Sequence, residues 1–132
     1  MKRLKGIDGK LDEAWAYLVK LEAGFKCEVC GTEKNLNSHH IWSRSNRSVR
    51  WNPANGVCLC VSHHTFNSKF SAHKTPTEFT YWLEETYGKP FLDDLRIEAN
   101  KTVKWYKHDK ETLLETLKTQ ITKLEELREK GS

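Results

Sequence analysis

Apolar residues near the N-terminus recur with the spacing of a helix. The residues that fall on one side of such a helix are Leu11, Trp15, Leu18 and Val19. This pattern predicts an amphipathic helix over residues 10–23 that buries one face. Gly24 is the expected stop, because glycine commonly follows the last helical residue.

The C-terminal half has three further helical patterns. Thr75 and Pro76 are expected to begin a helix that Gly88 ends, since proline is favoured in the first turn. Residues 91–100 predict a short helix, and residues 109–130 a long one. The long helix has an apolar stripe made of Leu114, Leu117, Ile121 and Leu124. The stripe suits packing on the body of the chain or on a second copy, and about two heptads favour the former.

The middle of the chain is less regular. Residues 25–31 have the pattern of a tight turn, and residues 35–42 predict a short strand that ends in two adjacent histidines. Residues 43–57 predict a loop, because Ser, Asn, Arg, Pro and Gly are frequent there. A helix is expected over residues 62–70.

The composition describes a small domain with a limited core. The chain has 132 residues, of which 37% are hydrophobic and 30% charged. No apolar run approaches the ~20 residues of a membrane span, and the first ten residues lack the apolar stretch of a secretory signal. We therefore expect no membrane contact and a cytoplasmic location, where cysteine pairs more often bind metal than form disulfides.

The net charge of +4 is unevenly distributed. Residues 1–75 contain 12 Lys/Arg against 6 Asp/Glu, whereas residues 76–132 contain 10 against 12. The basic half also contains all the cysteines. This distribution favours a polyanionic partner for that half, with nucleic acid first.

The cysteines predict a zinc site. Cys-x-x-Cys and Cys-x-x-His repeat one spacing, which lets a tight turn direct two side chains at one ion. The predicted ligands are Cys27, Cys30, Cys60 and His63. His64 remains an alternative to His63 as the fourth ligand. Cys58 is left over and is expected to be a small buried residue.

The spacing around this site resembles a known family. His40 is followed by fourteen residues, then Asn55, then eight residues, then His64. This pattern resembles the HNH nucleases of the ββα-metal superfamily, and so do the flanks "HHI" and "NGVCLC". The segment "SRSNRSVRWNPANGVCLC" is most similar to phage-type members, including relatives of the NinG recombination proteins. The family usually has Cys-x-x-Cys-His where this chain has Cys60-Val-Ser-His63-His64.

The resemblance implies an α+β fold with a zinc-stapled ββα-metal core, flanked by an N-terminal helix and C-terminal helices. The expected segments of this one compact domain are residues 1–24, 25–75, 76–108 and 109–132. A bacterial host cytoplasm is implied if the protein is phage-encoded.

The resemblance also assigns roles at the site. His40 would be the general base, and Asn55 would hold the loop and orient His40 through its side-chain amide. His39 and His64 would bind a catalytic divalent ion, for which Mn²⁺, Mg²⁺, Ni²⁺ or Zn²⁺ is expected. His73 could be a third ligand or a phosphate contact, but a surface histidine is slightly favoured.

Basic and aromatic residues surround this site in sequence. The expected DNA-binding residues are Arg44, Arg47, Arg50, Lys69 and Lys74, because guanidinium and ammonium groups contact phosphates. Trp42 and Trp51 would stack on bases if the DNA is single-stranded or branched, although a core position is favoured for Trp42.

Two functions fit these residues. The first is a metal-dependent HNH endonuclease that hydrolyses DNA, and the second is a zinc-containing adaptor that binds DNA without cutting it. Further partners implied are phage replication, recombination or packaging proteins, and a homodimer through the C-terminal helix. The presence of His40, Asn55 and His64 together favours the enzyme.

Overall fold

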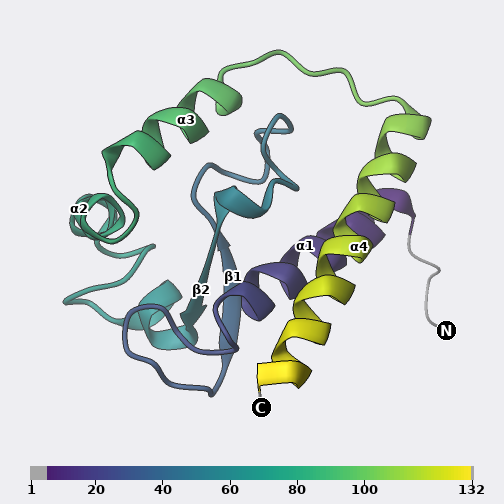
Figure 1. Ribbon diagram of the computed structural model, residues 1–132. Helices are drawn as coiled ribbons and strands as arrows, with labels where there is room; N and C mark the ends of the chain where they lie inside the picture. The colour runs from purple at the N-terminus through teal and green to yellow at the C-terminus, as the bar shows by residue number, and fades with distance from the viewer. Residues whose placement is uncertain (1–5, 132) are drawn as a thin grey trace, which may run out of the picture.

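Helices surround a two-stranded antiparallel sheet in residues 6–131, the part of the chain that the computed structural model describes (Figure 1). The elements follow the order α1 (Ile7–Glu22), β1 (Leu36–His40), η1 (Pro53–Asn55), β2 (Gly56–Cys60), η2 (Ser62–Phe66), α2 (Pro76–Tyr87), α3 (Lys89–Ala99) and α4 (Lys107–Gly131). The expected α+β class is confirmed. Residues 1–5 and 132 of the expected terminal segments lie outside the described residues.

The sheet separates two sets of contacts. β1 and β2 pair in antiparallel register, with His39 opposite Val57 and His40 opposite Gly56. Successive side chains of a strand point to opposite faces, so Val57 and Leu59 pack toward α2 while Cys58 packs toward α1. The two adjacent histidines of β1 are divided in the same way, as the alternation predicts.

The two terminal helices pack against each other. α1 buries Leu11, Trp15 and Leu18 against Leu114 and Leu117 of α4. Figure 1 shows α4 crossing α1 on the side away from α2 and α3. The apolar stripe of α4 therefore has a partner within the chain, as favoured from the sequence. No helix in residues 6–131 combines the length and apolarity needed to cross a membrane.

α1 approaches the sheet closely at one glycine. A Cβ atom added to Gly56 would lie 2.3 Å from Cγ2 of Val19 and 3.0 Å from Cζ2 of Trp15. Only a residue without a side chain fits there without displacing the helix. This contact places Trp15 beside the end of β1, where the histidines lie.

Two sequence expectations in the middle of the chain are wrong. The predicted loop ends earlier, because Gly56 and Val57 already pair with β1. The predicted helix over residues 62–70 is a single π-helical turn, η2. It stops because Asn67 takes an extended backbone and its side-chain Oδ1 accepts hydrogen bonds from the backbone N–H groups of Lys69 and Phe70. Such local bonds compete with a helix.

Candidate functional site

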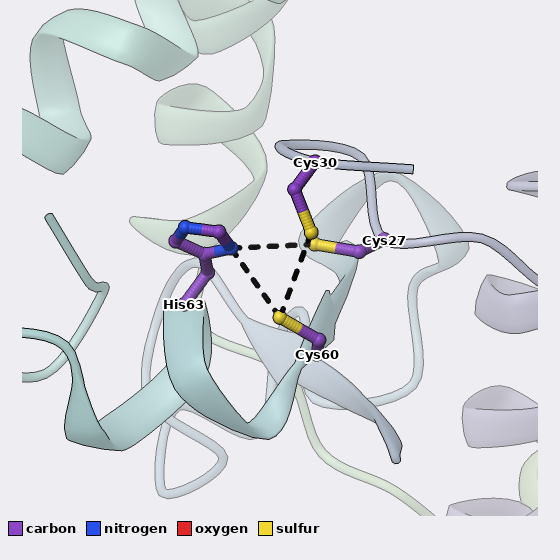
Figure 2. Close-up of side chains that lie close together, drawn as sticks. All are labelled: Cys27, Cys30, Cys60 and His63. Atoms are coloured by element: carbon purple, nitrogen blue, oxygen red, sulfur yellow. Dashed lines mark hydrogen bonds between the residues drawn. The ribbon is translucent and has the colours of Figure 1, made fainter. Parts of the chain in front are cut away.

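Three cysteines and one histidine converge where the 25–31 turn meets the end of β2. Figure 2 shows the side chains of Cys27, Cys30, Cys60 and His63 pointing toward a common centre. The Sγ atoms of Cys30 and Cys60 are 3.9 Å apart, and Sγ of Cys60 lies 3.3 Å from Nδ1 of His63. All four ligand atoms lie within 4.8 Å of one another. The predicted grouping is confirmed, and the fourth member is His63.

The chemistry of this cluster fits a tetrahedral ion. Ligand atoms at usual Zn–S and Zn–N distances are separated by roughly 3.5–3.8 Å, and the separations here bracket that range. All four cysteines are free thiols. Cys58 is fully buried away from the cluster, as expected for the unused cysteine. The group is compatible with structural zinc.

Backbone hydrogen bonds hold the turn that carries Cys27. Gly31 donates its backbone N–H to the carbonyl of Cys27, and Cys27 donates its backbone N–H to the carbonyl of Thr32. Burial raises the pKa of the Cys27 thiol, but hydrogen bonds with the backbone, including Cys60 and Cys30, outweigh burial and lower it to about 7. A thiol with such a pKa readily becomes the thiolate that binds metal.

A second cluster consists of three imidazoles. The Nε2 atoms of His64 and His73 are 3.1 Å apart, and the ring centroid of His39 lies 5.1 Å from that of His64. Nitrogens of all three rings lie within 4.8 Å of one another. Two imidazoles on one ion are separated by roughly 3.0–3.5 Å, so His64 and His73 already have the spacing of ligands.

His73 reaches this cluster through the backbone. Ala72 donates to the carbonyl of His63 at 2.8 Å, and His73 donates to that of His64 at 3.1 Å. These bonds align the segment after η2 with η2 itself. His73 is exposed, as expected for a surface histidine, and its ring lies beside that of His64.

Burial is the main influence on the protonation of His39 and His64. Burial and, after it, the neighbouring His64 and His73 together lower the pKa of His39 to about 3. The pKa of His64 is also lowered, first by burial and then by His73. Both rings are neutral near pH 7, which is the form that binds metals.

His40 lies on the other face of β1, against α1. Its ring stacks on Trp15, with centroids 3.8 Å apart and planes at 10°. Its Nε2 is 3.0 Å from the backbone carbonyl of Arg50. Because a carbonyl only accepts, Nε2 must donate, and Nδ1 of the neutral ring keeps its lone pair. Burial lowers the pKa of His40, which favours that neutral form.

Both histidine environments open onto one cleft. The cleft has a volume of about 430 Å³, and its lining includes His39, His40, Arg44, His64 and His73. β1 is paired only with β2 in the described residues, and its consecutive residues Ser38, His39 and His40 all line the cleft. His40 thus faces the cleft without belonging to the three-histidine cluster.

No protein-family model, curated protein or solved structure matches the chain. The interpretation of the site therefore depends on its own geometry.

The side-chain amide of Asn55 binds the backbone of the loop and does not bind His40. It is fully buried, its Oδ1 accepts from the backbone N–H of Trp42 at 2.7 Å, and its Nδ2 donates to the carbonyls of Trp42 and Val49. The expected contact between this amide and His40 is not formed. The group that orients His40 is the carbonyl of Arg50, one residue beyond Val49.

The arginines of the loop bind the acidic face of α1. Asp12 accepts hydrogen bonds from Nε and Nη2 of Arg50 at 3.1 and 2.8 Å, and from Nε1 of Trp51 at 2.8 Å. Burial raises the pKa of Asp12, but the hydrogen bonds from Arg50 and Trp51 outweigh it and lower the pKa overall. The Arg50 side chain is only 13% exposed and Trp51 is buried. Neither can act as the phosphate or base contact expected from the sequence.

The remaining expected DNA contacts are at the surface. The Arg44 side chain lines the cleft and is 63% exposed, although it also reaches Asp12 at 3.2 Å. Arg47 pairs with Asp8 at 3.4 Å. Lys69 and Lys74 are exposed near His73 in sequence. Arg44 is the one arginine of the three that faces the cleft.

Sequence reasoning missed two contributors to the site. Trp15 was interpreted only as a core residue, and the carbonyl of Arg50 carries no side-chain signal. The close approach of α1 at Gly56 depends on contacts between residues far apart in the chain, which no local pattern encodes.

Proposed function

We propose that this chain is a metal-dependent endonuclease of the HNH type that hydrolyses phosphodiester bonds in DNA. The observation that carries the proposal is the position of His40 at the edge of a cleft shared with His39, His64 and His73. A base with a free nitrogen and a separate group of metal ligands face the same space.

His40 would act as the general base. Its Nε2–H is committed to the carbonyl of Arg50, so the lone pair on Nδ1 is the atom that accepts a proton from the attacking water. Stacking on Trp15 fixes the plane of the ring. A base held in this way contributes about 10²- to 10⁴-fold to the rate.

His39, His64 and His73 would hold the divalent ion. When bound, such an ion stabilises negative charge on the phosphate and on the leaving oxygen. Imidazole nitrogens suit Mn²⁺, Ni²⁺ or Zn²⁺ better than Mg²⁺. Arg44 would contact a phosphate at the rim of the cleft, since its guanidinium is largely exposed. The Cys27–His63 group would hold a structural zinc that keeps η2 in place.

The test is nicking of supercoiled plasmid by purified protein with Mn²⁺, Mg²⁺, Ni²⁺ or EDTA. We expect wild type to nick in the presence of metal, and His40→Ala to be slower by at least about 100-fold. His108→Ala is the matched control, because the His108 side chain is 81% exposed, contacts its neighbours Asp109 and Tyr106, and does not line the cleft.

Equal cutting by wild type and His40→Ala would refute the assignment of the base. Metal-independent binding of DNA in a gel shift, with no cutting by either protein on plasmid, flap or junction substrates, would instead support the adaptor function.

A further inference from the structure

A second cavity adjoins the cleft at the end of β1. It has a volume of about 500 Å³ and shares His39 and Ile41 with the cleft. Its other walls come from α2, α3, Trp42 and Ala72. Cavities of about 300–1,000 Å³ are the size that small organic ligands occupy. Nothing in the proposed hydrolysis uses this space.

The walls are apolar and aromatic. Phe79 meets the ring of His39 edge-on, with centroids 5.4 Å apart, and His39 is the member of the three-histidine cluster that borders the cavity. Trp42 is half-buried and packs on the small cluster around Val49 and Leu95. These surfaces suit a flat, unsaturated ring better than a charged group.

The mouth of the cavity is polar and cationic. Arg96 is exposed at the rim. Asp93, one turn earlier, pairs with Lys89 at 2.9 Å, which offsets its negative charge. An apolar, aromatic interior with a guanidinium at the mouth matches a nucleobase attached to a phosphate.

We propose that this cavity receives an unpaired nucleobase next to the phosphate that is cut, which makes single-stranded or flapped DNA the preferred substrate. The inference rests on the proposed nuclease function. A base inside a duplex is stacked on both sides and cannot enter a side pocket, so it must be unpaired or extruded. Continuity through His39 places the pocket beside the scissile phosphate, and Arg96 contacts the neighbouring phosphate.

The test compares DNA flaps that differ by one base. Abasic residues are placed, one at a time, at the three positions on either side of the cut, and single-turnover cleavage by the full chain is measured with Mn²⁺. We expect one position at which loss of the base slows cleavage by at least about fivefold. Equal rates at every position would overturn the inference.

A variant that fills the cavity gives the matching evidence from the protein side. Thr80 lies at its exposed edge on α2, so Thr80→Trp should bring the rates for intact and abasic DNA together. Tyr81→Trp is the control, because Tyr81 is 61% exposed on the same helix and does not line the cavity. A base preference that survives in Thr80→Trp would count against the pocket. The abasic series itself uses the unaltered protein.

Two measurements separate failure of the pocket from failure of the nuclease. Bis(p-nitrophenyl) phosphate has no base, so its Mn²⁺-dependent hydrolysis by wild type, but not by His40→Ala, supports the nuclease regardless of the pocket. Fluorescence anisotropy without added Mn²⁺ or chelator measures binding of the same flaps without cutting and leaves a structural zinc in place. Tighter binding of the intact flap, lost in Thr80→Trp, supports the pocket even if no substrate is cut, whereas equal binding of intact and abasic flaps overturns it.

Discussion

His63 and His64 are adjacent in η2, but their rings belong to different clusters. His63 joins three sulfur atoms, and two of the cysteines in that cluster are buried. His64 joins two other imidazoles beside a cleft of about 430 Å³. The first donor set matches closed structural sites, whereas three protein nitrogens beside open space match sites that leave a position for a reactant. One turn of chain thus supplies a side chain to each of the two clusters.

The largest effect is expected when one sulfur is removed from the cluster that contains His63. We expect Cys27→Ser to lose its bound zinc and its cooperative unfolding transition, because structural zinc contributes on the order of 10 kcal/mol to small domains. Metal content measured by mass spectrometry and thermal unfolding followed by circular dichroism check this. Cys58→Ala is the control, since Cys58 is buried outside the cluster, and it should keep one zinc per chain. Zinc retained by Cys27→Ser would contradict the assignment.

Substitution of His64 should affect mainly plasmid nicking, whereas substitution of His63 should affect mainly thermal stability. His64→Ala is expected to lower plasmid nicking by at least about 100-fold, because an ion supplies several kcal/mol of charge stabilisation, with little change in melting temperature. His63→Ala should instead lower the melting temperature and release zinc. The paired measurement is nicking rate and melting temperature for both variants. If His64→Ala released the zinc and His63→Ala did not, the two histidines would have to exchange roles.

The smallest effect is expected at Asp12, which binds the side chain of Arg50, the residue whose backbone carbonyl orients His40. The folded-state pKa of Asp12 is lowered from 3.8, so its carboxylate stabilises the fold above about pH 4. That contribution is lost as the pH falls through the lowered pKa. Asp12→Asn should therefore cost about 1–2 kcal/mol near pH 7, and the difference from wild type should shrink below pH 4.

Urea unfolding of both proteins between pH 3 and 7 measures this difference. Glu98→Gln is the matched control, because Glu98 forms an exposed pair with Lys101, and it should behave like wild type throughout. A difference for Asp12→Asn that does not vary with pH would argue against the carboxylate as its source.

The features that could be predicted from the sequence depend on residues close together in the chain, whereas those that could not depend on contacts between distant residues. The grouping of Cys27, Cys30, Cys60 and His63 could be predicted because each pair is separated by two residues. The helices could be predicted because their apolar faces recur regularly. Contacts of His73 with His64 depend on backbone bonds that no spacing reveals. The loop arginines looked free in the sequence, yet their partners Asp8 and Asp12 lie more than thirty residues away in α1. The helix predicted over residues 62–70 is shorter in the structure because the Asn67 side chain accepts a hydrogen bond from the backbone of Lys69 and forms a local turn.

The packing of α1 on α4 has a consequence for the order of events during synthesis. Leu11 and Leu18 are made early, whereas Leu114 and Leu117, which cover them, follow about a hundred residues later. Until α4 leaves the ribosome, the apolar face of α1 lacks this cover, and the helix that carries Trp15 is only partly held. Contacts across so long a stretch of chain form slowly, because a large loop must close first. On a growing chain, the packing of Trp15 against His40 would therefore become stable only after α4 has been made.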